Sequence, residues 1–157
     1  MKKSNHIDNK GNVQMIDIGN KAPTSRKAVA SGHILLSKDA LKSILQNENK
    51  KGDVLTIAQV AGIQAAKKTS QIIPLTHTLN IVAANIDFSI KPDRVECTSE
   101  IKCDSKTGVE IEAIHATQIA LLTIYDMCKY IDKTMTISDI HLVSKEGGKS
   151  GEYKRSQ

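Results

Sequence analysis

Two strand-like runs joined by a short turn constrain the fold of this chain most. Residues 81–90, IVAANIDFSI, and residues 94–103, RVECTSEIKC, both have the composition of β-strands. Between them stands Lys-Pro-Asp, a sequence typical of tight turns. The two runs are therefore expected to form a hairpin, around which the rest of the chain must pack.

Helix-start signals and apolar periodicity place the other segments around this hairpin. Ser37 and Asp53 each precede a segment with helical spacing, so both are expected to cap helices. The second helix ends at Pro74, because a proline forces the preceding residue out of helical backbone. A longer helix follows the hairpin, and its expected apolar surface comprises Ile114, Ile119, Leu122 and Ile131. In chain order we expect a strand, two helices, the two hairpin strands, a helix and a strand at residues 26–37, 38–47, 54–70, 81–90, 94–103, 109–132 and 135–145.

This order of elements predicts an α+β fold. With one helix set aside as an extra helix, it is the split βαβ arrangement of ferredoxin-like domains, an antiparallel sheet covered on one face by helices. The strands are apolar, so we expect another copy of the chain to cover the other face. Residues 1–24 are polar and are expected to form a flexible N-terminal arm. Residues 25–157 are expected to form a single domain with a Gly-rich C-terminal loop at 145–157.

Charge and aromatic content narrow the class of partner. Aromatic residues make up only 3% of the 157 residues, so the core must be aliphatic. A formal net charge of +5 favours anionic partners such as phosphates, nucleotides or nucleic acid. A basic ferredoxin-like RNA binder would need stacking aromatic side chains on its sheet, and one Phe and three Tyr do not supply them. We therefore expect a small anionic ligand and no nucleic acid.

Cysteine usage and hydropathy indicate the compartment. The three cysteines, Cys97, Cys103 and Cys128, lack C-x-x-C pairing, which predicts buried reduced thiols in a cytoplasmic protein. The N-terminal sequence is basic but has no apolar run after it, so no secretory signal is expected. The longest apolar runs, such as IALLTIY, are too short to cross a bilayer, and no membrane partner is expected.

The segment VSKEGGKSGEYK contains Gly-Lys-Ser, the final part of the phosphate-binding P-loop. A P-loop requires glycine five positions before the Gly of Gly-Lys-Ser, and Val143 stands there. The segment is therefore not a P-loop. On these residues alone, a solvated basic tail explains it.

The long helix carries charged residues in an apolar setting. Asp126 and Lys129 share one face, either as a surface ion pair or as a carboxylate beside an ammonium in a site. Glu112 precedes Asp126 by 14 positions, which is about 21 Å along a helix axis and too far for one small catalytic centre. Two such helices packed antiparallel about a two-fold axis near Ile119 would bring Glu112 of one chain to Asp126 of the other. The spacing therefore predicts a site shared between subunits.

Four segments in order resemble one family. KGDVLTIAQVAGIQAAKKTSQIIPLTH, KTGVEIEA, LTIYDMCK and SKEGGKSG are similar to the cyclic pyranopterin monophosphate synthases of molybdenum cofactor biosynthesis, and the resemblance covers about residues 15–153. It implies a lyase that converts (8S)-3',8-cyclo-7,8-dihydroguanosine 5'-triphosphate to cyclic pyranopterin monophosphate and pyrophosphate. It also implies a ferredoxin-like fold and a hexamer, built as a trimer of dimers, with sites at the dimer interface.

The resemblance also implies which residues form the site. The family's catalytic aspartate falls on Asp126, and its lysines fall on Lys129 and Lys145. The implied substrate-binding residues are Leu75, Thr76, His77, Ile111 and Glu112, with the basic residues Lys51, Arg26, Lys67 and Lys149 facing the phosphates.

These residue types suit the implied chemistry. A carboxylate and a lysine with tuned pKa values can share the proton transfers, and Lys and Arg stabilise the charge that builds up on departing pyrophosphate. No His, Cys and carboxylate cluster has metal-ligand spacing, so we expect no metal site and no cofactor, except for Mg²⁺ carried in by the triphosphate.

Two departures from the family pattern bear on activity. Thr76, His77 and Thr78 stand where the family has Cys-His-Pro, and the missing proline frees the backbone after His77. His115 stands where the family has a small or hydroxyl residue, near Glu112 on the same helix face. His115 is either a neutral neighbour or an added titrating group. The alternative function is therefore a diverged, non-catalytic member that binds a nucleotide, a pterin or a pathway partner.

Overall fold

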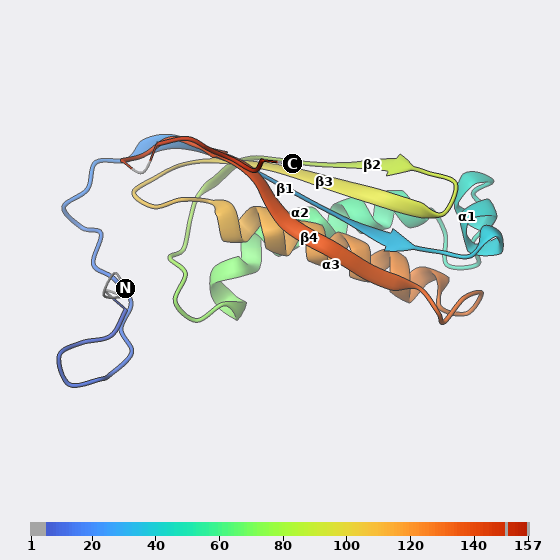
Figure 1. Ribbon diagram of the computed structural model, residues 1–157, viewed down its shortest axis with the longest axis horizontal. Helices are drawn as coiled ribbons and strands as arrows, with labels where there is room; N and C mark the ends of the chain where they lie inside the picture. The colour runs from blue at the N-terminus through green and yellow to red at the C-terminus, as the bar shows by residue number, and fades with distance from the viewer. Residues whose placement is uncertain (1–5, 150, 157) are drawn as a thin grey trace.

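The computed structural model describes residues 6–149 and 151–156 and has the predicted α+β fold. Five antiparallel strands form one sheet in the order β2-β3-β1-β4-β5, and helices α2 and α3 lie side by side on one face of it (Figure 1). The elements are β1 (Thr24–Leu35), α1 (Lys38–Leu45), α2 (Val54–Ile72), β2 (Ile81–Ile90), β3 (Arg94–Ser105), α3 (Glu110–Cys128), β4 (Thr136–Glu146) and β5 (Tyr153–Lys154).

The predicted arm and the predicted C-terminal loop are only partly covered by this description. Residues 1–5 of the arm and residues 150 and 157 of the loop lie outside the described residues. Residues 6–23 precede β1 and extend away from the end of the sheet (Figure 1), with one isolated bridge between Ile7 and Val13.

Both predicted helix caps are present. The Ser37 side chain accepts a hydrogen bond from the backbone N–H of Ala40, and Asp53 accepts one from the backbone N–H of Thr56 at 3.0 Å. The Asp53 carboxylate also accepts the Thr56 hydroxyl at 2.7 Å. These caps satisfy N–H groups that the first turn of each helix leaves without partners, so the two helix starts were readable from the sequence.

The core lies between the sheet and the two long helices. β1 and β3 turn alternate residues toward α2 and α3, and Cys97 and Cys103 of β3 are both buried there. Of the expected apolar surface of this segment, Ile114 and Ile131 pack against the core, whereas Leu122 is 50% exposed. The surface that packs on the sheet is one of small and medium side chains, Ala113, Ala116, Ala120, Leu121 and Ile124.

Small residues set how closely α2 and α3 approach each other. Gly62 of α2 faces α3, and a Cβ added there would lie 3.1 Å from the backbone oxygen of Ala116 and 3.3 Å from the Cβ of Ala120. The same atom would lie 3.2 Å from the side chain of Ile86 on β2. The chain has almost no aromatic bulk, so close backbone approach rather than side-chain volume fills this layer.

The open face of the sheet is polar, which corrects the expectation that it is apolar. Lys27 pairs with Glu146 at 2.9 Å, and Lys102 pairs with Glu100 at 2.9 Å. His33 and Ser138 share a hydrogen bond of 3.0 Å. In β1 and β3 most apolar residues alternate with these polar ones and face the helices, whereas Leu35 lies on the open face and is 38% exposed.

The Gly-rich segment folds back on the sheet. β4 continues through Lys145 to Glu146, and β5 then pairs with it, with Tyr153 opposite Lys145. Gly147 and Gly148 both have positive φ, and a Cβ on either would collide, with the backbone oxygen of Ser25 and with the Arg26 guanidinium respectively. The sequence did not predict β5.

The three cysteines are free and buried, as predicted. Burial raises the pKa of Cys97 to about 12 and that of Cys128 to about 11, which keeps both thiols protonated and unreactive. Within residues 6–149 and 151–156, the helices fall short of the length and apolarity needed to cross a membrane.

Replacing Gly62 by valine should destabilise the protein by about 1–3 kcal/mol, because the branched side chain would push α3 away from α2. Urea unfolding measures the change. Gln64→Val, at an exposed position two residues on, is the matched control and should cost less than about 0.5 kcal/mol. An unchanged unfolding midpoint for Gly62→Val would contradict the close packing of the two helices.

Candidate functional site

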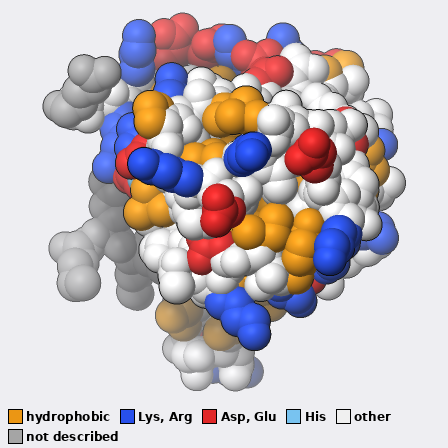
Figure 2. Space-filling model, turned by 90° about the vertical axis from the view of Figure 1, so that its right-hand side faces the viewer, with side chains coloured by type: hydrophobic (Ala, Val, Ile, Leu, Met, Phe, Trp, Pro, Cys, Tyr) orange, Lys and Arg blue, Asp and Glu red, His pale blue; other side chains and the backbone are white. Residues whose placement is uncertain are grey.

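The predicted site residues gather at the two opposite ends of α3. This helix has 19 residues and is therefore about 28 Å long. Its C-terminal end lies near α1, whereas its N-terminal end lies near the arm and the loop before β2 (Figure 1). At the α1 end, basic, acidic and apolar side chains intermingle on the surface (Figure 2).

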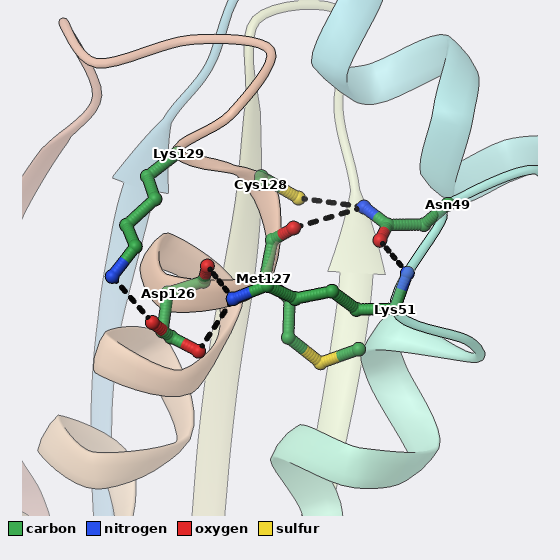
Figure 3. Close-up of polar contacts among 6 residues, drawn as sticks. All are labelled: Asn49, Lys51, Asp126, Met127, Cys128 and Lys129. Atoms are coloured by element: carbon green, nitrogen blue, oxygen red, sulfur yellow. Dashed lines mark hydrogen bonds and ion pairs between the residues drawn. The ribbon is translucent and has the colours of Figure 1, made fainter.

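Asp126, Lys129 and Lys51 form one group, here called the Asp126 cluster. The Asp126 carboxylate lies 2.7 Å from the Lys129 ammonium and 3.0 Å from that of Lys51 (Figure 3). Lys51 also donates to the backbone oxygen of Asp126 at 2.8 Å. The three side chains are 40–55% exposed, so the ion pairs contribute little to stability.

Asn49 positions Lys51 against α3, a role that the sequence did not reveal. Its side chain is buried, accepts the backbone N–H of Lys51 at 2.9 Å and donates to the backbone oxygen of Met127 at 3.2 Å (Figure 3). The next residue is tied as well, because the backbone N–H of Lys50 donates to the Tyr130 hydroxyl at 3.0 Å. The loop between α1 and α2 is thereby fixed to the C-terminal end of α3.

The ion pairs hold the Asp126 cluster in its charged form. Hydrogen bonds from Lys129 and then Lys51 lower the pKa of Asp126, and the hydrogen bond to Asp126 raises the pKa of Lys129. Both pKa values move away from neutral pH, whereas general acid–base catalysis is most effective when the pKa lies near the working pH. An anion that draws the ammonium groups toward itself would leave Asp126 a stronger base.

A basic cavity of about 750 Å³ lies at the other end of α3. It is lined by residues from the arm, β1, the loop after β3, the start of α3 and the Gly-rich segment. Among the described residues that line it, the charged side chains are Lys21, Arg26, Lys106, Lys145, Lys149 and Glu110. Five cations against one carboxylate make this cavity suited to phosphate groups.

Two contacts fix the orientation of Lys145 and Arg26 in the basic cavity. Lys145 pairs with Glu110 at 3.0 Å, with both side chains about one quarter exposed. The Arg26 Nε donates to the backbone oxygen of Ser105 at 3.0 Å. The structure therefore brings Arg26, Lys145 and Lys149 together in one cavity, and it adds Glu110, Lys21 and Lys106, which the sequence did not reveal.

A second, more apolar cavity of about 390 Å³ adjoins the first, and we call it the mixed cavity. The two share Lys21, Thr107, Gly108 and Glu110 in their linings. All five implied substrate-binding residues line the mixed cavity, namely Leu75, Thr76, His77, Ile111 and Glu112. Lys67 is exposed on α2 and lines neither cavity.

Glu112 and His115 are both buried but differ in their chemistry. Burial raises the pKa of Glu112 to about 7, so this carboxyl can exchange a proton near neutrality. Burial lowers the pKa of His115, and its Nδ1 hydrogen-bonds the Thr69 hydroxyl of α2 at 3.1 Å. His115 is therefore a neutral packing residue between the helices.

The loop that lacks the family's proline is held by side-chain hydrogen bonds instead. The Thr78 hydroxyl lies 3.2 Å from the hydroxyl of Ser70 at the end of α2. The Thr76 hydroxyl donates to the backbone oxygen of Ile73 at 2.8 Å. These two contacts tether the backbone on either side of His77.

The strand order β2-β3-β1-β4, with two helices on one face, makes this a ferredoxin-like α+β domain, and its basic cavity is suited to phosphate groups. A model of the MoaC family matches residues 15–148, and the chain belongs to that family. It is 55% identical over 153 residues to the cyclic pyranopterin monophosphate synthase of Clostridium botulinum, covering 96% of each chain. It is 50% identical over 156 residues to the same-named protein of Desulforamulus reducens, covering 99% of this chain and 95% of that one.

Among the residues that the structure describes, no group of three or more His, Cys, Asp or Glu side chains is arranged to hold a metal ion.

Glu112→Gln should flatten the pH dependence of stability. Above its ordinary pKa of about 4.3 the unfolded chain loses the Glu112 proton, whereas the native protein keeps it up to about pH 7. The native state of the parent therefore loses stability as pH rises through this window, by an amount on the order of 3 kcal/mol, and the loss is complete above pH 7. Urea unfolding at pH 5 and pH 8 measures it.

The matched control is Glu48→Gln, at an exposed position in the loop after α1. It should keep the parent's difference in stability between the two pH values. If Glu112→Gln keeps that difference as well, Glu112 does not titrate near neutrality.

Proposed function

We propose that this chain is a cyclic pyranopterin monophosphate synthase, a lyase of molybdenum cofactor biosynthesis. It would convert (8S)-3',8-cyclo-7,8-dihydroguanosine 5'-triphosphate to cyclic pyranopterin monophosphate and pyrophosphate. The observation that carries the proposal is the near-complete match to relatives of that name, together with a basic cavity beside a mixed cavity. A location in the cytoplasm accords with three reduced, buried thiols.

We propose that different parts of the substrate bind in the two cavities. In this proposal the triphosphate lies in the basic cavity, against Arg26, Lys145 and Lys149, and the fused ring lies in the mixed cavity beside His77 and Glu112. Cyclisation of the phosphate forms a bond from a substrate hydroxyl to the α-phosphorus and breaks the bond to pyrophosphate. The cations stabilise the charge that collects on the leaving group.

A dimer is proposed to complete the site. The Asp126 cluster and the two cavities stand at opposite ends of a helix about 28 Å long, so one chain alone cannot bring them together. Antiparallel packing of α3 against α3 of a second copy would place the Asp126 cluster of one chain at the cavities of the other. A trimer of such dimers is the hexamer that the family resemblance implies.

Substrate binding would then adjust the protonation of the Asp126 cluster. Phosphate groups that attract Lys51 and Lys129 weaken the hydrogen bonds that lower the pKa of Asp126. Asp126 could then take the proton of the attacking hydroxyl, while Lys129 and Lys145 stabilise the phosphates. Any Mg²⁺ that enters with the triphosphate would be held by the substrate's own oxygens.

The alternative is a non-catalytic family member that binds a nucleotide, a pterin or a pathway partner. The missing proline after His77 motivated it. The hydrogen bonds of Thr76 and Thr78 favour the enzyme, because they hold the loop without that proline.

The enzyme proposal is tested by incubating the purified protein with the cyclised triphosphate and measuring pyrophosphate release. The parent should release pyrophosphate, and Asp126→Asn should lower turnover at least ~100-fold. Asp39→Asn, in the first turn of α1 and outside both cavities and the Asp126 cluster, is the control and should match the parent. A parent protein that releases none would favour the non-catalytic alternative.

Subunit mixing tests whether the site is shared. Asp126→Ala and Lys145→Ala chains, each inactive alone, should recover activity when unfolded and refolded together. Random pairing leaves half the dimers mixed with one intact site each, so about one quarter of the parent activity is expected. Lys145→Ala mixed with Glu112→Ala should recover none, since both changes lie at the same end of α3. Recovery in both mixtures, or in neither, contradicts a shared site.

A further inference from the structure

Part of the N-terminal arm forms one wall of both cavities. Ile16 and Ile18 line the mixed cavity, and Asn20 and Ala22 line the basic cavity. Lys21 lines both. The arm, the loop after β3 and the loop before β2 all lie at the same end of the molecule (Figure 1). This stretch, residues 16–22, is called the arm wall.

Three hydrogen bonds give the arm wall a defined turn. The Asp17 side chain accepts the backbone N–H of Gly19 at 2.7 Å, and the backbone N–H of Lys21 donates to the oxygen of Ile18 at 3.1 Å. The Lys106 ammonium donates to the backbone oxygen of Gly19 at 2.6 Å. The first two bonds shape the turn, and the third attaches it to the loop between β3 and α3.

Lys21 lies at the junction of two cavities that differ in polarity. The basic and the mixed cavity both include it in their linings, together with Thr107, Gly108 and Glu110. A ligand with a phosphate chain at one end and a planar apolar ring at the other would cross this junction. The phosphate nearest the ring would then lie beside the Lys21 ammonium, a point charge well suited to phosphate oxygens.

We propose that Lys21 is a substrate-binding residue that contacts this phosphate, and that Lys106 is a positioning residue that holds the arm wall in place through Gly19. The identity of the ligand rests on the proposed function, whereas the binding of a phosphate chain does not. Ile16 and Ile18 supply the apolar side of the same wall, opposite the loop that carries His77. The arm is therefore part of the binding site.

Pyrophosphate binding, measured by isothermal titration calorimetry on the full-length protein, tests the role of Lys21. Lys21→Met should weaken the Kd about tenfold, and Lys21→Arg, which keeps the charge, should restore much of it. Lys10→Met is the matched control, because Lys10 lies on the same arm, is exposed and lines neither cavity. It should bind as the parent does.

Hydrogen exchange of the arm wall tests the role of Lys106. Lys106→Met should speed amide exchange within residues 16–22 and weaken pyrophosphate binding, because the attachment at Gly19 is lost. Lys21→Met should leave exchange in this stretch unchanged, so the two variants separate contact from positioning. Equal exchange in Lys106→Met and the parent would overturn the positioning role.

Two further outcomes distinguish a failure of the proposal for Lys21 from a failure of the proposed function. If the parent binds pyrophosphate but releases none from the cyclised triphosphate, the enzyme proposal fails and the role of Lys21 is still measured. If the parent does not bind pyrophosphate, or if Lys21→Met binds it as tightly as Lys10→Met, the proposal for Lys21 is wrong. Unchanged urea unfolding midpoints would exclude misfolding as the cause of weaker binding.

Discussion

The close packing of α2 against α3 is the constraint on which the rest of the structure depends. A Cβ added at Gly62 would lie 3.1 Å from the backbone oxygen of Ala116 in α3, and Ala113, Ala116 and Ala120 of α3 are fully buried. A chain with 3% aromatic residues cannot fill this layer with large side chains, so backbone approach supplies the contact. The axis of α3 is thereby fixed, and with it the positions of Glu112 at one end and Asp126 at the other.

Because α3 is long, it keeps two carboxyl groups with different acid–base properties far apart. Asp126 stands in an exposed group whose hydrogen bonds keep carboxylate and ammonium charged, whereas Glu112 is buried and has a pKa raised to about 7 by desolvation. The Asp126 cluster has paired charges and lies outside the two cavities, whereas the Glu112 end has the cavities. The proposed dimer would bring the two ends of different chains together.

The ligand cavities are built from segments far apart in the chain. Arg26 of β1, the start of α3, Lys145 of β4 and the arm wall converge because β1 lies between β3 and β4 in the sheet. Glycines at 147 and 148 let the chain turn tightly beside Ser25 and Arg26 and return as β5. The segment that first suggested a P-loop thus becomes a hairpin that holds Lys145 at the edge of the basic cavity.

The sequence by itself determined the order of elements, the caps at Ser37 and Asp53, the buried thiols and the family, because these follow from local patterns and ordered motifs. It misplaced Leu122 on the packed face of α3 and misjudged the polarity of the open sheet face, since both depend on how elements are oriented in space. Only the tertiary structure joined Lys51 to Asp126, Glu110 to Lys145 and Lys106 to Gly19. These contacts link residues 35 to 87 positions apart, because side-chain reach across packed elements does not depend on sequence separation.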